Sequence, residues 1–295
     1  MPAQETSKTG GVGGDTELFR KAAEILSRGE PFVMATVVRT RGSTPRKAGA
    51  RMIVDRRGNR YGTISGGCVE AEVYAAARER FGKSGSDLLS FTLNDDAAAE
   101  YGLRCGGTME VFVERVDPKP VLFLVGAGHI NSALARLGVL LGFEVHLLDD
   151  HPGFLDPADH PAEVVLHECA IEAAAEKIPS GSHVAVVIAT RGHKQDSAAF
   201  RPLSGRDLGY LGLVSSRKRV LEFYSQLKEE GVPVERLERI AAPVGLDIGA
   251  HSPPEIAVAI IAEILARFRN GSGKPLREAF WALPGTRKVL CGETR

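Results

Sequence analysis

The chain has 295 residues, which is long enough for two domains that each bury a hydrophobic core. Its 37 basic and 37 acidic side chains balance, so the overall charge argues against nucleic acid or a membrane surface as a partner. Apolar residues make up 43% of the sequence, as in ordinary globular proteins, and no apolar run reaches the roughly 18 residues of a membrane span.

The amino terminus and the cysteines indicate the cellular compartment. The segment 1–14 is polar and rich in glycine, without the hydrophobic core of a signal peptide, and we expect a flexible lead-in there. The four cysteines are scattered and form no CxxC pair, which disfavours a structural zinc site. We therefore expect a cytoplasmic protein whose cysteines are thiols.

The first domain begins with a predicted helix over 15–28, capped by Asp15. A β-rich run follows over 32–38. Two short strands over 52–54 and 61–64 flank a glycine-containing turn, which is typical of a hairpin. These elements predict a mixed α/β domain whose sheet is mixed or antiparallel.

The segment that leads into this hairpin, together with the hairpin's first strand and turn, is strongly basic. Residues 39–60 carry eight basic side chains against a single acid. Arg41, Ser43, Arg46 and Lys47 share its glycine-containing loop, and guanidinium groups with hydroxyl donors suit a phosphate. A solvated basic surface is the alternative that the sequence leaves open.

Two cysteines of this domain are flanked by paired glycines. Gly-Gly-Cys over 66–68 comes just before a predicted helix over 70–81, where the field of the helix amino terminus favours a thiolate. Cys-Gly-Gly over 105–107 directly precedes a strand predicted over 108–113. Since thiolate sulfur suits soft metals, both cysteines are candidates for metal contact, with an inert buried thiol as the alternative.

A proline-bearing segment over 116–120 predicts the boundary between two domains. The first domain then covers 15–115 and the second covers 121–270. Residues 271–295 are expected to form a polar tail, to which the sequence assigns no role.

The second domain opens with a predicted βαβ unit. Its first strand, over 121–125, is apolar throughout, as a parallel sheet covered on both faces requires. Gly126 and Gly128 then let the turn approach a phosphate at the amino terminus of the next helix, and Asp149, about 20 residues on, suits a ribose hydroxyl. Asn131 stands where the pattern has a third glycine. The glycines predict a nucleotide-type ligand, although they can also serve only to form the turn.

Further strands predicted over 164–166, 183–190 and 210–214 give a Rossmann-like, doubly wound parallel sheet. Arg191 and His193 follow the second of these strands. They are expected at the carboxyl edge, where open α/β sheets bind ligands.

Several of these motifs recur together in one known family. In combination they resemble the XdhC/CoxI family of molybdenum hydroxylase maturation factors, over about residues 15–269. The resemblance rests on GSTPRKAG at 42–49, SGGCVE at 65–70, CGG at 105–107, VGAGH at 125–129, TRGHKQD at 190–196, the segment 212–219, APVGLDIG at 242–249 and PPEIAVAIIAE at 253–263. Asn131 and His151 depart from the family pattern.

The resemblance implies an amino-terminal XdhC/CoxI domain followed by a Rossmann domain. It also implies a cytoplasmic accessory protein that binds molybdenum cofactor and passes it to a xanthine-dehydrogenase-like or CO-dehydrogenase-like apoenzyme. Sulfuration of the cofactor is expected while it is held, with a cysteine-desulfurase-type sulfur donor as a second partner. A chaperone is favoured over an enzyme, an NAD(P)-dependent oxidoreductase being the alternative, and a homodimer stays open.

The expected cofactor site combines both domains. Arg41, Arg46 and Lys47 are predicted to hold the phosphate, Cys68 or Cys105 to contact molybdenum, and the glycine turn of the second domain to hold the pterin or a nucleotide such as NAD(P). Cys68 is expected to matter more, because it has the helix-end field. The predicted binding residues are Arg41, Ser43, Arg46, Lys47, Gly66, Gly67, Cys68, Glu70, Cys105, Gly106, Gly107, Gly126, Gly128, His129, Asp149, Arg191 and His193.

Overall fold

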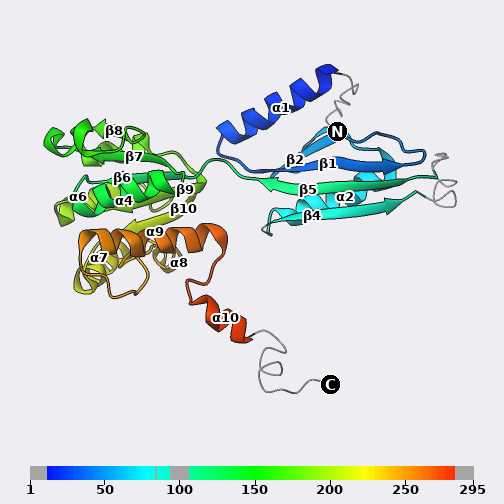
Figure 1. The fold of residues 1–295 in the computed structure, drawn as a ribbon. Coiled ribbons are helices and arrows are strands. Elements are labelled where there is room, and N and C mark those ends of the chain that lie inside the picture. Colours follow the sequence, from blue (N-terminus) through cyan, green and yellow to red (C-terminus); the bar gives the residue numbers. More distant parts are fainter. Residues whose placement is uncertain (1–11, 84, 94–105, 283–295) are drawn as a thin grey trace. The chain divides into compact units, whose positions relative to one another are not determined.

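A computed structural model of the chain describes residues 12–83, 85–93 and 106–282 (Figure 1). The chain divides into two compact units between Lys119 and Pro120. Each unit has its own sheet and its own hydrophobic core. Among the described residues, every helix is too short or too polar to cross a membrane.

The amino-terminal unit contains a five-stranded sheet in the order β3-β2-β1-β5-β4, and every neighbouring pair is antiparallel. This is one of the two arrangements that the sequence predicts. The strands are β1 (Phe32–Arg41), β2 (Arg51–Asp55), β3 (Arg60–Gly62), β4 (Ser86–Thr92) and β5 (Thr108–Val116).

Two helices pack on opposite faces of this sheet, α1 (Val12–Ser27) and α2 (Gly67–Arg80). Side chains of β1 alternate between the two cores, as the period of two in a strand requires. Val33 and Ala35 belong to the α2 core, and Phe32 belongs to the α1 core. The predicted start of α1 was wrong: the helix begins before Asp15, which therefore lies in its first turn rather than at its cap.

The strand register places the motif-bearing loops at one end of the sheet. Arg41, at the end of β1, pairs with Thr108, at the start of β5, and Thr108 also pairs with Thr92, at the end of β4. The start of β2 and the end of β3 lie at this same end, because Thr36 pairs with Arg51. The loop after β1, the turn before α2 and the start of β5 therefore leave the sheet together.

The carboxyl-terminal unit contains five parallel strands in the order β10-β9-β6-β7-β8. All five residues of β6 are buried, as predicted for a strand covered on both faces. The strands are β6 (Val121–Val125), β7 (Glu144–Asp149), β8 (Val165–Glu168), β9 (Gly181–Ile188) and β10 (Leu208–Leu213).

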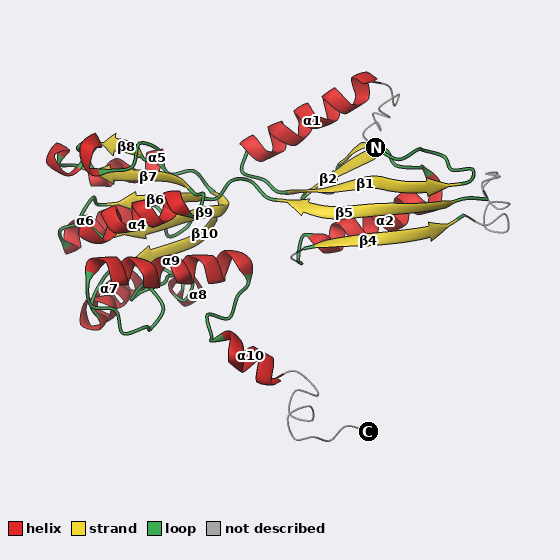
Figure 2. Ribbon diagram, viewed as in Figure 1, coloured by secondary structure: helices red, strands yellow, loops and turns green. Residues whose placement is uncertain are grey.

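Helices cover both faces of this parallel sheet (Figure 2). One face carries α4 (His129–Leu140) and α9 (Pro253–Arg269). The other face carries the 3₁₀ turn η3 (Ile171–Ala173), α5 (Ala174–Lys177), α6 (His193–Phe200), α7 (Arg217–Glu229) and α8 (Val234–Leu237). The Rossmann-like, doubly wound fold predicted from the sequence is therefore confirmed.

Two further features lie near the end of the chain. Ala241, which follows α8, pairs alongside Gly212 of β10. The segment expected as a polar tail contains a short helix, α10 (Leu276–Ala282).

Candidate functional site

Close backbone packing joins two motifs at the loop end of the amino-terminal sheet. A Cβ atom on Gly107 would lie 2.5 Å from the carbonyl oxygens of both Arg41 and Ser43. A Cβ atom on Gly42 would lie 3.1 Å from the Cα of Gly107. Only glycine allows this approach, so the structure brings Ser43 together with the Gly106–Gly107 pair.

The turn before α2 exposes a thiol. Gly66 and Gly67 have φ of 81° and 63°, in the left-handed region that favours glycine, and Cys68 follows as an exposed residue in the first turn of α2. Cys105 lies outside the described residues. Of the two predicted thiols, Cys68 is therefore the one that the structure places.

Glu70 shapes this turn from within. Its Oε2 accepts hydrogen bonds from the backbone N–H groups of Ile64, at 3.3 Å, and Gly66, at 3.2 Å, and from the hydroxyl of Thr63. Burial acts to raise the pKa of the Glu70 carboxyl, but these hydrogen bonds outweigh it and hold the pKa below its ordinary value. The carboxylate thus supports the turn that presents Cys68, and its direct contact with a cofactor stays a prediction.

The predicted phosphate-binding side chains lie at the end of β1 and in the loop that follows it. Arg41, Ser43 and Lys47 are exposed and Arg46 is half-buried, while the Thr44 hydroxyl donates to the Arg46 carbonyl at 2.9 Å and fixes the bend. Other arginines of the basic segment form ion pairs: Arg39 with Glu110, Arg51 with Asp15, and Arg57 with Glu30. The exposed cations of the loop are available to a phosphate, and the alternative of a solvated basic surface stays open.

The two glycines of the turn between β6 and α4 have different roles. A Cβ atom on Gly126 would lie 2.3 Å from the carbonyl oxygen of Ala189, and Gly126 has φ of 93°, so packing of β6 against β9 requires this glycine. A Cβ atom on Gly128 would have no atom within 4 Å, and His129 beside it is exposed at the start of α4. The space beside Gly128 is therefore open.

Asp149 is engaged by the protein itself. The residue is 2% exposed. Its Oδ2 accepts from the backbone N–H of Ala127 at 2.7 Å, and its Oδ1 accepts from the N–H of His151 at 2.9 Å and from Nη2 of Arg191 at 3.2 Å. The carboxylate thus holds the glycine turn against the end of β7, and its contact with a ribose stays a prediction.

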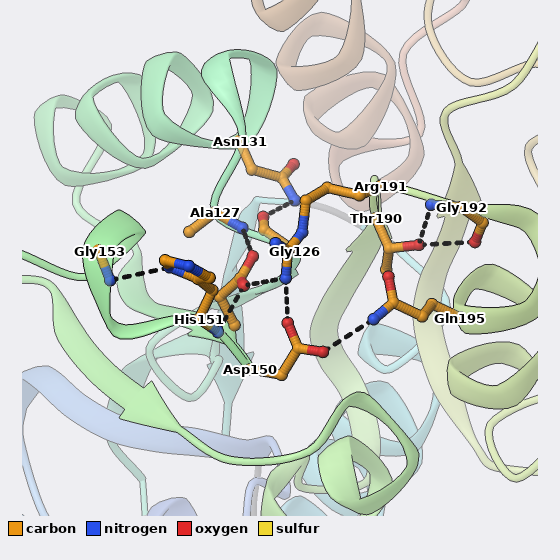
Figure 3. Close-up of polar contacts among 11 residues, drawn as sticks. Gly126, Ala127, Asn131, Asp150, His151, Gly153, Thr190, Arg191, Gly192 and Gln195 are labelled. Atoms are coloured by element: carbon orange, nitrogen blue, oxygen red, sulfur yellow. Dashed lines mark hydrogen bonds and ion pairs between the residues drawn. The ribbon is translucent and has the colours of Figure 1, made fainter.

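Arg191 joins the end of β7 to the segment after β9. Its guanidinium also donates to Asp150, and Gln195 donates to Asp150 at 2.8 Å (Figure 3). The guanidinium carbon lies 5.3 Å from the ring centre of Phe154. His193 begins α6, but its side chain lies outside the described residues. Arg191 and Asp149, both predicted site residues, are therefore in direct contact.

Sequence reasoning missed part of this network. Asn131 is fully buried, and its Nδ2 donates to the carbonyl oxygens of Val125, at 3.1 Å, and Gly126, at 2.7 Å. The residue that replaces the third glycine thus fastens the turn to α4. Asp150 directly follows Asp149, and Gln195 lies in the TRGHKQD motif, but nothing in the sequence indicates that the two side chains meet, because they are 45 residues apart.

Two family models match most of the chain. A model described as the XdhC Rossmann domain matches residues 122–264. A model described as the XdhC and CoxI family matches residues 25–92.

Three curated proteins are similar over most of this chain. Uncharacterized protein YqeB of Escherichia coli (strain K12) is 38% identical over 87% of this chain, which spans only 47% of YqeB. A probable xanthine dehydrogenase subunit of Bacillus subtilis (strain 168) is 26% identical over 82% of this chain and 94% of its own length. Molybdenum cofactor insertion chaperone PaoD of E. coli (strain K12) is 23% identical over 84% of this chain and 86% of its own.

Proposed function

Because this chain belongs to the XdhC/CoxI family, we propose that it binds molybdenum cofactor and delivers it to a xanthine-dehydrogenase-type apoenzyme. The name of PaoD describes an insertion chaperone for this cofactor, and the name of the B. subtilis relative links it to xanthine dehydrogenase. Those names support a role in maturation of a molybdenum hydroxylase.

The observation that carries the proposal is the exposed Cys68 on its glycine turn. Molybdenum cofactor presents a soft metal and a phosphate, and a thiolate and guanidinium groups are suitable ligands for the two. Cys68 would contact the metal. Arg41, Arg46 and Lys47, which share the loop end of the sheet, would hold the phosphate.

Sulfuration and the partners complete the proposal. The cofactor would be sulfurated while bound, with a cysteine-desulfurase-type donor, and then transferred to the apoenzyme. In the carboxyl-terminal unit, the turn at Gly128 would hold a nucleotide.

Retention of cofactor tests this function. The full chain is purified from cells that make molybdenum cofactor, and bound molybdenum and pterin are assayed together. We expect molybdenum and pterin in the wild-type protein and in the control Cys169→Ala, which removes a half-buried thiol of the carboxyl-terminal unit. In Cys68→Ala, the amount of bound molybdenum and pterin should fall by about tenfold or more. Equal retention in Cys68→Ala would remove this thiol from the mechanism, and wild-type protein without either component would contradict the carrier function.

The open space at Gly128 also favours a second function, an NAD(P)-dependent oxidoreductase. Titration of NADH and NADPH, followed by nucleotide fluorescence, separates the two. The carrier function predicts little or no turnover of either nucleotide, and steady oxidation with any acceptor would favour the oxidoreductase.

A further inference from the structure

Three of the four sheet edges in the described part of the chain are short or covered. The edge strand β3 has three residues, and the edge strand β8 has four. The edge strand β10 is covered by the segment after α8, where the N–H of Ala241 donates to the Leu211 carbonyl at 2.9 Å and the N–H of Leu213 donates to the Ala241 carbonyl at 2.9 Å. Short or covered edges keep unpaired backbone groups away from other chains.

The fourth edge is β4, and it is neither short nor covered by any strand among the described residues (Figure 1). It has seven residues, and it pairs with β5 in a continuous register along one side. Its sequence, SDLLSFT, contains no proline and no lysine. Proline, lysine and bulges are the usual features that prevent an edge strand from pairing with another chain, and β4 has none of them.

The register identifies the backbone groups of β4 that point away from β5. The N–H of Leu93, directly after β4, donates to the Gly107 carbonyl at 2.8 Å. Backbone groups along an antiparallel strand point alternately toward the partner and away from it, so every second residue counted from Leu93 is bonded to β5. The residues between them, which point their N–H and C=O groups outward, are Ser86, Leu88, Ser90 and Thr92.

The side chains of β4 are apolar on both faces of the sheet. Leu89 and Phe91 pack against the α2 core on one face. Leu88 lies on the other face and is 59% exposed. The single charged residue of the strand, Asp87, already forms an ion pair with Arg80. The edge therefore offers backbone hydrogen bonds and apolar surface, without an unpaired charge that would repel a second strand.

The strand is complementary to itself. When two copies of β4 run antiparallel about a two-fold axis at Leu89, Leu88 lies opposite Ser90 of the second copy, so outward-pointing residues face each other as a ladder requires. Asp87 then lies opposite Phe91 of the second copy, and the two acids do not meet. Like charges directly opposite each other would destabilise the pair.

We propose that β4 is the interface of a homodimer, in which two copies of this chain pair along β4 and form one continuous sheet from five strands of each copy. The two Leu89 side chains lie opposite each other on the α2 face and extend the apolar core across the interface. This inference goes beyond the proposed function and does not depend on which cargo the chain binds.

Sedimentation of the full chain over a dilution series tests the interface. The wild-type chain should be a dimer in the micromolar range. Ser90→Pro removes one outward N–H and leaves the bonds to β5 in place, as proline is tolerated where the N–H of an edge strand faces solvent. Leu88→Lys places a cation at the same edge. Each variant should raise the dimer Kd by about tenfold or more.

Leu140→Lys is a matched control. It is the same substitution at an 80% exposed leucine of α4, in the other unit, and we expect the wild-type Kd. Thermal unfolding verifies that each variant is folded, and Leu88→Lys decides the result if Ser90→Pro does not fold.

Cross-linking tests the register. Leu89→Cys is made in a chain whose four native cysteines are replaced by alanine. Two such cysteines would lie opposite each other, with Cβ atoms about 5 Å apart, so mild oxidation should link the two copies. Ser90→Cys in the same background lies opposite Leu88 and should link more slowly. Faster linking of Ser90→Cys would contradict this register.

Two outcomes would overturn the interface. One is a wild-type chain that stays monomeric throughout the micromolar range. The other is a dimer whose Kd is the same in folded Ser90→Pro and Leu88→Lys as in Leu140→Lys, because a different surface would then hold the two copies. The molybdenum and pterin assay of Cys68→Ala decides the proposed function separately.

Discussion

The two candidate sites use similar motifs in different ways. Each has glycines in a turn before a helix, α2 in the amino-terminal unit and α4 in the carboxyl-terminal unit. At the first site, Cys68 and Lys47 point to solvent. At the second site, Asp149 and Arg191 bind each other and the turn. A glycine motif therefore specifies a backbone shape, and its neighbours decide whether that shape is open to a ligand or already filled by the protein.

The largest predicted effect is a difference in stability between substitutions at Gly126 and at Gly128, in the turn between β6 and α4. Gly126→Ala places a methyl group against the Ala189 carbonyl at a positive φ, and we expect the free energy of unfolding to fall by about 3 kcal/mol. Gly128→Ala enters open space and should change it by less than about 0.5 kcal/mol. Denaturant unfolding followed by circular dichroism measures both. Equal losses would contradict the different roles of these glycines.

The next effect concerns Glu70, whose carboxylate is hydrogen-bonded within the amino-terminal unit. Glu70→Gln weakens three hydrogen bonds to the turn before α2 and should destabilise the protein by about 2 kcal/mol. Because the pKa of Glu70 is lowered in the folded protein, its contribution is present above the ordinary carboxyl pKa and is lost as the pH falls through the lowered value. Unfolding at neutral and acidic pH should show a weaker acid dependence in this variant. Glu72→Gln, an exposed acid of the same helix, is the control.

The rate of thiol alkylation should distinguish the exposed Cys68 from the half-buried Cys169. Cys68 is exposed, whereas Cys169 is half-buried and burial raises the pKa of its thiol. Iodoacetamide at neutral pH should therefore modify Cys68 roughly tenfold faster, a difference that corresponds to ~1.4 kcal/mol. Peptide mass spectrometry at timed intervals gives both rates. Faster modification of Cys169 would show that the turn before α2 shields its thiol.

The smallest effect lies outside both sites and concerns the pH response of two stacked histidines. His167 stacks with His146, with 2.9 Å between Nε2 and Nδ1, and burial lowers its pKa. Its contribution to stability is fully present above the ordinary histidine pKa of about 6.5 and is lost as the pH falls from there through the lowered value. We expect His167→Gln to reduce the difference between the melting temperatures at pH 7.5 and 5.5. An unchanged difference would assign that response to other groups.

Local patterns predicted most of the fold. The bounds of β6 agree with the sequence prediction to the residue, because an unbroken apolar run defines the strand. The start of α1 was wrong, since an acid in a first turn and an acid at a cap give the same signal at Asp15. The parallel direction of the strands in the carboxyl-terminal unit could be predicted because strands alternate with helices along the chain.

Contacts between distant residues could not be predicted in this way. Nothing near Gly126 in the sequence indicates that Ala189 lies against it, or that Gly128 alone faces open space. The sequence suggested Asp149 as a ligand residue because it shows the acid but not the backbone donors that come to it. These facts depend on how β9 and β7 flank β6, which only the folded sheet determines.

The loop end of the amino-terminal sheet has a practical consequence for experiments. The turn over 56–59, between β2 and β3, emerges from the opposite end, because Asp55 pairs with the first residue of β1. A fluorophore attached there through Arg57→Cys, with the exposed thiol of Cys68 protected, would lie at the end of the sheet away from the loop after β1. Such a label can report binding of a large partner protein as a change in rotational mobility.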